Sequence, residues 1–109
     1  MAEMTDEDRK LVILARGAMG RAEARGGAAV RDGDGRTYAG ATVSKSTLQL
    51  SALQVAVATA LSSGATSFEA AVLIGGDVDD PGVATLHEIT PDAAVHCTDA
   101  AGNLTGEPS

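Results

Sequence analysis

Apolar positions near the start of the chain recur at the spacing of an α-helix. They would form one buried stripe, made of Leu11, Leu14, Ala15, Ala18 and Ala22. Thr5 precedes three acidic residues, an order typical of a helix start, because a hydroxyl caps the first turn and acids favour its positive end. The pair Gly26-Gly27 is expected to end this helix.

A β-hairpin is predicted directly after this helix. The short apolar run 28–30 would form its first strand, and the Asp-Gly repeats of 32–35 are typical of the turn that closes a hairpin. Residues 37–43 carry Tyr38, Ala41 and Val43 and would form the returning strand.

A second helix is expected to begin at Ser46 or Thr47, either of which can act as a cap, and to run to about Leu61. Residues 62–64 would stop it. The stretch 50–61 has no charged residue. A helix that is apolar nearly all round is usually covered on several sides, so we expect this one to lie centrally against a sheet.

The last third alternates again between strand and loop. Residues 68–74 form a continuous apolar run of the kind found in buried parallel strands, and 75–82 are expected to form a loop. The segment 83–89 fits either a short helix or a strand, and 93–98 would form a final strand. The chain is therefore expected to be one α/β domain over residues 1–109, with about 1–5 and 103–109 flexible.

Charge excludes several classes of partner. The net charge is −7, and all eight basic residues lie between Arg9 and Lys45, so residues 46–109 carry eight acids and no base. Nucleic acids and anionic membranes are bound by basic surfaces, so both are disfavoured. A basic strip around Arg16, Arg21 and Arg25 would either meet an acidic partner or an acidic face of a second copy of the chain, or form a solvated helix face. The acidic N-terminus and the lack of a long apolar run favour a cytoplasmic protein without a membrane span.

The order of elements and several short motifs resemble the cytidine deaminase-like family. The resemblance runs from about residue 11 to 102 and implies a three-layer α/β sandwich, with a small mixed sheet of about four to five strands flanked by helices. The matching segments are 27–30, 34–36 with Tyr38 and Gly40, 51–56 with 63–64, 68–72, and 91–95 with Asp99 and Gly102.

The catalytic residues of that family are missing at the matching positions. Zinc deaminases use a His or Cys ligand, a Glu two residues later, and a Pro-Cys-x-x-Cys turn. Ser51 stands in place of the first ligand and Leu53 in place of the Glu, and no cysteine follows Pro81-Gly82. A hydroxyl is a poor zinc ligand, and leucine cannot carry a proton.

The family's residues that grip the ribose, an Asn and a Glu, match Thr42 and Ser44, which cannot make the same bidentate contacts. The resemblance thus predicts a degenerate pocket without catalytic or metal-binding residues and without a cofactor. Its lining would be Thr42, Ser44, Ser51, Leu53, Pro81 and Gly82.

Other candidate sites are weaker. His87, His96 and Cys97 are the only imidazole and thiol ligands in the chain. His96 and Cys97 are neighbours on a predicted strand, so their side chains would point to opposite faces and could not readily share a metal ion. The acidic loop 77–80 lacks the spacing of a calcium-binding EF-hand. Ser51 as a nucleophile would need a base that the pattern does not place beside it.

Three functions follow as hypotheses. The first is a catalytically inactive cytidine deaminase-like protein that serves as a binding or assembly module. The alternative is a deaminase-type hydrolase that uses an unrecognised site, and the third is a structural subunit that only self-associates. A homo-oligomer, dimer or tetramer, is expected, because the charge-free helix needs cover and the two parts of the chain differ in charge. A protein partner and, less strongly, a nucleoside-like ligand are left open.

Overall fold

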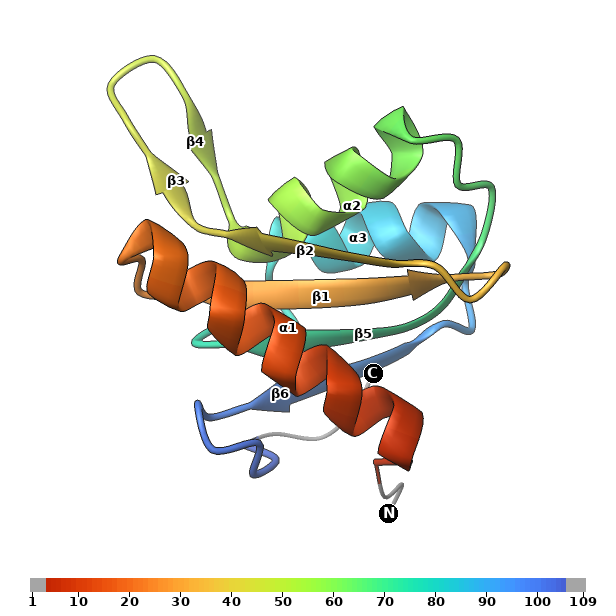
Figure 1. The fold of residues 1–109 in the computed structure, drawn as a ribbon. Helices are drawn as coiled ribbons and strands as arrows, with labels where there is room; N and C mark the ends of the chain where they lie inside the picture. Colours follow the sequence, from red (N-terminus) through yellow and green to blue (C-terminus); the bar gives the residue numbers. More distant parts are fainter. Residues whose placement is uncertain (1–3, 106–109) are drawn as a thin grey trace.

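The computed structural model describes residues 4–105. Helices and strands alternate along the chain (Figure 1). In chain order they are α1 (Asp6–Ala22), β1 (Gly27–Asp32), β2 (Thr37–Ala41), β3 (Val43–Ser44), β4 (Gln49–Leu50), α2 (Ala52–Ser62), β5 (Phe68–Ile74), α3 (Pro81–Ile89) and β6 (Ala94–Thr98).

Four of these strands form one mixed sheet in the order β2-β1-β5-β6. Strand β1 runs antiparallel to both β2 and β5, whereas β5 and β6 are parallel. Helix α1 covers one face of the sheet, and α2 and α3 cover the other (Figure 1). The predicted three-layer α/β sandwich with a small mixed sheet is therefore confirmed.

Strand β5 shows how the core is divided between the two faces. Its side chains alternate, so Ala71 and Leu73 pack beneath α2 and α3, while Ala70, Val72 and Ile74 pack beneath α1. Both faces are covered, which explains why this strand is a continuous apolar run in the sequence.

Helix α1 begins where the sequence predicts, with one change in its buried stripe. The Thr5 hydroxyl accepts a hydrogen bond from the Asp8 amide at 3.0 Å. Leu11, Ala15 and Ala18 are buried, but Leu14 and Ala22 are exposed and Val12 is buried. The buried stripe therefore includes Val12 and has Leu14 at its margin. Ala22 lies outside it, as the last residue of the helix.

The predicted start of the second helix at Ser46 or Thr47 is wrong. Helix α2 begins at Ala52, because Ser51 forms a capping box with Gln54. The Ser51 hydroxyl accepts from the Gln54 amide at 3.0 Å, and the Ser51 amide donates to Gln54 Oε1 at 2.9 Å. The residues before it belong to a two-stranded hairpin, β3–β4, that projects from the body (Figure 1). The returning strand of the first hairpin accordingly ends at Ala41.

The segment that fitted either helix or strand is helix α3, which has Pro81 in its first turn and Asp80 as its N-cap. Both described ends of the chain make contacts. Met4 lies in the α1-side core, and the Thr105 amide donates to the Cys97 carbonyl at 2.8 Å. The prediction that about 1–5 and 103–109 are flexible also covers residues 1–3 and 106–109, which lie outside the described residues. Within residues 4–105, no helix combines the length and apolar character needed to cross a membrane.

Candidate functional site

The N-termini of α2 and α3 meet at the end of the sheet where β5 leads into α3. Their two N-cap residues bond to each other: the Ser51 hydroxyl donates to Asp80 Oδ1 at 2.7 Å. The same Asp80 oxygen accepts from the Gly82 amide at 2.8 Å. One carboxylate thus satisfies the first turn of α3 and holds the cap of α2.

Apolar atoms fill the space directly behind this bond. Leu53 is fully buried, and Gly82 lies against it so closely that a Cβ on residue 82 would stand 2.7 Å from Leu53 Cγ and 2.8 Å from the Gln54 amide nitrogen. Only glycine fits at this approach of the two helices. Pro81, beside it, is exposed.

Thr42 and Ser44 lie elsewhere, beside the C-terminal end of α1. They line an open cavity of about 700 Å³ that none of the other four predicted pocket residues lines. The Thr42 hydroxyl donates to the Gly26 carbonyl at a long 3.5 Å. The structure therefore brings together Ser51, Leu53, Pro81 and Gly82 and places the other two in a neighbouring cavity. That cavity is lined by Ala22, Glu23, Ala24, Arg25, Thr42, Val43, Ser44 and Lys45.

Comparison with known proteins agrees with the fold described above. A family described as cytidine deaminase-like matches residues 4–102. The chain belongs to the cytidine deaminase-like family. No curated protein sequence matches it significantly.

Solved structures of cytidine deaminases share the fold. The enzyme from Burkholderia pseudomallei superposes with a TM-score of 0.77 at 23% identity, covering 97% of this chain and 92% of that one. The Mycobacterium leprae enzyme gives 0.68 at 20%, covering 91% and 92%. A point mutant of the Mycobacterium tuberculosis enzyme gives 0.66 at 22%, covering 83% of each chain. The resemblance to this family in the sequence is therefore confirmed.

A cytidine deaminase-like protein of the zinc type needs three protein ligands and a carboxylate near the metal. The donors here do not fit that requirement. Ser51 offers a neutral hydroxyl, and Asp80 is engaged as a helix cap. Among residues 4–105 no three His, Cys, Asp or Glu side chains are grouped so that they could hold a metal ion.

The imidazole and thiol groups of this cytidine deaminase-like chain are placed apart. His96 faces α1, where Nε2 lies 3.1 Å from Asp8 Oδ2, whereas Cys97 lies in the core beneath α2 and α3, as predicted for neighbours on a strand. Burial, and then the negative charges of Asp77 and Asp80, raise the pKa of the Cys97 thiol. A thiol held protonated is a poor metal ligand.

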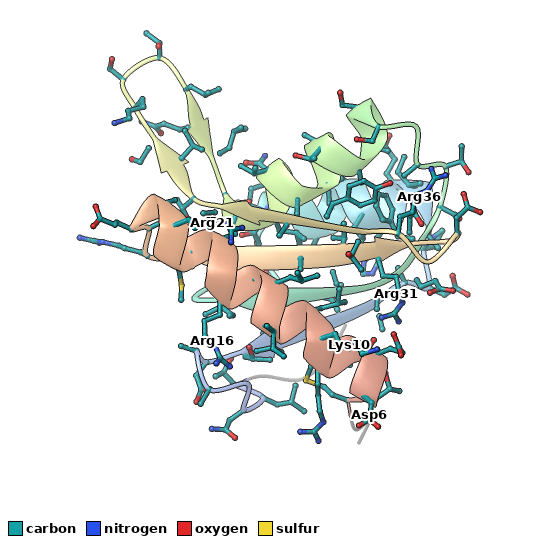
Figure 2. All side chains as sticks on the ribbon, viewed as in Figure 1. Asp6, Lys10, Arg16, Arg21, Arg31 and Arg36 are labelled. Carbon is teal, nitrogen blue, oxygen red and sulfur yellow. The ribbon has the colours of Figure 1, made fainter. Side chains whose placement is uncertain are left out.

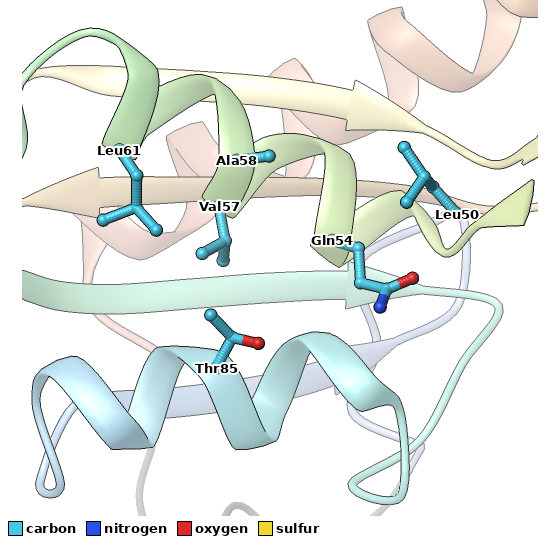
Figure 3. Close-up of a pocket in the computed structure, with 6 residues that line it drawn as sticks. All are labelled: Leu50, Gln54, Val57, Ala58, Leu61 and Thr85. Atoms are coloured by element: carbon cyan, nitrogen blue, oxygen red, sulfur yellow. The ribbon is translucent and has the colours of Figure 1, made fainter. Parts of the chain in front are cut away.

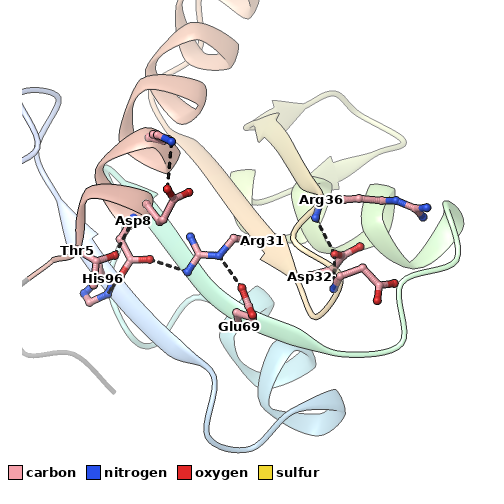
Figure 4. Close-up of polar contacts among 10 residues, drawn as sticks. Thr5, Asp8, Arg31, Asp32, Arg36, Glu69 and His96 are labelled. Atoms are coloured by element: carbon pink, nitrogen blue, oxygen red, sulfur yellow. Dashed lines mark hydrogen bonds and ion pairs between the residues drawn. The ribbon is translucent and has the colours of Figure 1, made fainter.

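The structure also shows a buried charged cluster that sequence reasoning missed (Figure 4). Asp8, only 6% exposed, accepts from Arg31 Nη2 at 2.9 Å and lies beside His96, which is 3% exposed. Arg31 Nε also donates to Glu69 at 2.7 Å. Burial lowers the pKa of Arg31, but the bonds to Glu69 and Asp8 outweigh it and the pKa is raised. One signal was available: Asp8 precedes the buried Leu11 by three residues, so it lies on the buried face of α1.

The basic strip along α1 and just beyond its C-terminal end forms no ion pair with an acid of the described residues. Arg16, Arg21 and Arg25 are all exposed, and Arg16 and Arg21 are labelled on α1 in Figure 2. Within residues 4–105, none of the three forms an ion pair. Arg16 and Arg21 lie on α1 and Arg25 follows its last residue, Ala22, and the exposure of all three agrees with a solvated face and with a partner contact alike.

An apolar groove runs between the outer surfaces of α2 and α3 (Figure 3). We call it the α2–α3 groove; its volume is about 200 Å³. Its lining contains no charged residue and consists of Leu50, Gln54, Val57, Ala58, Leu61 and Thr85. Helix α2 is therefore buried on its inner side only, and the cover expected on several sides is not supplied by the described residues of the chain itself.

Proposed function

We propose that this cytidine deaminase-like chain does not deaminate cytidine and works as a binding or assembly module that associates with copies of itself. The hydrogen bond between the caps of α2 and α3, with Leu53 packed behind it, is the observation that supports this most. It joins Ser51 to Asp80 at the two helix ends where the family motifs would supply ligands and a proton carrier.

Each chemical role in the deamination lacks a group to perform it. Hydrolytic removal of the amino group needs an activated water and a carboxylate that moves protons between water, ring and leaving amine. Leu53 can neither accept nor donate a proton, and Asp80 already accepts two hydrogen bonds as a cap. Neutral hydroxyls at Thr42 and Ser44 line a separate cavity, so a nucleoside-like ligand is the weaker part of this proposal.

Self-association is supported by the composition of α2. Neither the helix nor the α2–α3 groove contains a charged residue, although the chain carries a net charge of −7. Apolar surface without charge is the kind that a subunit interface covers. A dimer or tetramer is the expected state, a further protein partner is left open, and the cytoplasm is the proposed location.

An activity assay tests the first half of the proposal. The purified chain, supplied with Zn²⁺, is incubated with cytidine while the ultraviolet absorbance of cytidine is followed, with the Burkholderia pseudomallei cytidine deaminase as positive control. We expect no loss of cytidine beyond the protein-free rate. Elemental analysis after dialysis is expected to find far less than one zinc per chain. Turnover above the protein-free rate would refute the proposal and favour the unrecognised-site hydrolase.

A further inference from the structure

Helix α1 presents an isoleucine to solvent on the side that faces away from the sheet. Ile13 is 64% exposed, more than any other large apolar side chain among residues 4–105. Residues two positions apart on a helix point to nearly opposite sides, so Ile13 lies opposite Leu11 and Ala15, which are both fully buried. The described residues of the chain therefore leave Ile13 largely uncovered.

Three arginines surround this isoleucine. Arg9 lies one turn before Ile13, and Arg16 lies nearly one turn after it, on the same side of the helix. Arg21 folds back over Gly17, the residue one turn after Ile13, because a Cβ on Gly17 would stand 3.2 Å from Arg21 Nη1. We call Ile13 and the three arginines around it the Ile13 patch.

The arginines of the patch are exposed and have no acidic partner within residues 4–105. All the acids of α1 lie in its first turn, where Asp8 is paired with Arg31 and Glu7 with Lys10. The patch therefore gathers three free positive charges on a chain whose net charge is −7. Its electrostatic complement is an acidic group supplied from outside the chain.

The chemistry of the patch asks for two kinds of group in the same ligand. Guanidinium groups bind carboxylates through paired hydrogen bonds. An apolar side chain within a ring of polar groups is typical of the centre of a protein interface, where it serves as an anchor. A protein segment can supply both, as carboxylates placed around an apolar side chain.

A long polyanion fits the patch less well. Charges act over only about 8 Å at physiological ionic strength. Beyond the patch a nucleic acid or an anionic membrane would meet acids: Asp6 and Glu7 begin the helix, and residues 46–109 carry eight acids and no base. The two aromatic residues, Tyr38 and Phe68, lie outside α1, so the patch offers no ring on which a base could stack.

We propose that the Ile13 patch docks a short acidic segment of another protein, with carboxylates on its three arginines and an apolar side chain on Ile13. The helix rises about 18 Å from Arg9 to Arg21, which is the length of about six residues of extended chain. The inference rests on the binding role proposed above and names the chemistry of the partner left open there. Helix α1 and the α2–α3 groove lie on opposite faces of the sheet, so the two surfaces can be tested separately (Figure 1).

Fluorescence anisotropy with labelled synthetic probes tests the docking. The first probe is a peptide of eight glutamates around a central leucine, and the second has glutamines in place of the glutamates. A ten-nucleotide oligothymidine serves as an anion of another class. At about 0.15 M NaCl we expect the glutamate peptide to bind at least about 10-fold more tightly than either of the others, and more weakly as the salt concentration is raised.

Matched double variants locate the contact. Arg16→Gln with Arg21→Gln removes two charges from the patch, and Arg36→Gln with Lys45→Gln removes two charges from exposed positions outside α1. The first pair is expected to weaken binding of the glutamate peptide about 5-fold or more, and the second pair less than about 2-fold. Circular dichroism melts check that both variants are folded.

A double-mutant cycle tests the apolar contact. Ile13→Ser is measured with the leucine peptide and with the same peptide carrying serine at its centre. The loss of affinity is expected to be about 3-fold or more with the leucine peptide and under about 1.5-fold with the serine peptide, because only the leucine loses a contact with Ile13.

The outcomes separate this inference from the proposed function. Equal binding of the glutamate and glutamine peptides, equal losses in the two double variants, or an equal effect of Ile13→Ser on both peptides overturns the docking and leaves the proposed function standing. Oligothymidine that binds as tightly as the glutamate peptide overturns the choice of a protein segment. A change of oligomeric state in sedimentation that only the patch variant shows means that a second copy covers the patch, which also overturns the inference. Turnover of cytidine would refute the proposed function, yet peptide binding with the expected losses would still support the docking.

Discussion

Replacing Asp8 by alanine is expected to cost this protein a large part of its stability. Asp8 is the only group through which α1 is bonded to both β1 and β6 among the described residues: its two oxygens meet Arg31 and His96. The variant leaves the Arg31 guanidinium with Glu69 alone and leaves His96 without its partner. Removing one partner of a buried ion pair costs about 3–5 kcal/mol.

The lower end of that range applies here, because Arg31 keeps its bond to Glu69. A loss of about 3 kcal/mol corresponds to a melting temperature lower by roughly 12 °C or more for a domain of this size. Urea titration and thermal melting, both followed by circular dichroism at neutral pH, would measure it.

Glu7 provides the matched control. Glu7 is also an acid in the first turn of α1, so replacing it removes the same kind of favourable interaction with the helix dipole. Its ion pair, however, is with Lys10 on the exposed surface, at 3.1 Å. Glu7→Ala is expected to cost about 0.5 kcal/mol. If Asp8→Ala destabilises the protein no more than Glu7→Ala does, the buried cluster does not hold α1 on the sheet, and this reasoning is wrong.

Three further predictions concern the caps, the helix approach and the hairpin turn. Ser51→Cys with Leu53→Glu should leave cytidine untouched in the ultraviolet assay and lower the stability by several kcal/mol, because the new carboxylate enters an apolar core; an unchanged melt would contradict the burial of Leu53. Gly82→Ala should cost about 1–3 kcal/mol from overpacking, while Gly20→Ala, in open space on α1, should stabilise by about 0.5–1 kcal/mol; equal effects in thermal melts would disprove the close approach. Burial raises the pKa of Asp32, but hydrogen bonds from Arg36, Tyr38 and Asp34 outweigh it and the pKa is lowered, so the contribution of Asp32 to stability is present above about pH 4 and is lost as the pH falls below that. An Asp32→Asn variant should lose stability less steeply than the wild type below about pH 4 in urea titrations, and a slope equal to that of the wild type would refute this.

Local signals in the sequence were enough to predict most of the helices and strands. The Asp-Gly turn and the apolar run of β5 each depend on neighbouring residues, and both are confirmed. The prediction of where α2 begins was wrong, because Ser46, Thr47 and Ser51 can all cap a helix. The Gln three residues after Ser51 was the discriminating signal, since it completes a capping box.

The hydrogen bonds of the candidate site and of the buried charged cluster could not be predicted, because they join residues that are far apart in the sequence. Ser51 and Asp80 are 29 residues apart, and Asp8 and His96 are 88 apart. The sequence could predict that the family's ligands and proton carrier are absent, because that prediction depends only on the residue types at single positions. It could not show that one cap would bond to the other.

The bond between Ser51 and Asp80 has a consequence for how the protein meets its surroundings. Where a bound metal ion ties two helix ends together, the stability of the fold varies with metal supply, pH and the presence of chelators, because metal binding is part of the folding free energy. Here the two helix ends are tied by a hydroxyl and a carboxylate that belong to the chain. If the proposed function without zinc is right, we therefore expect the junction of α2 and α3 to stay intact in a cell starved of zinc or in a buffer containing a chelator.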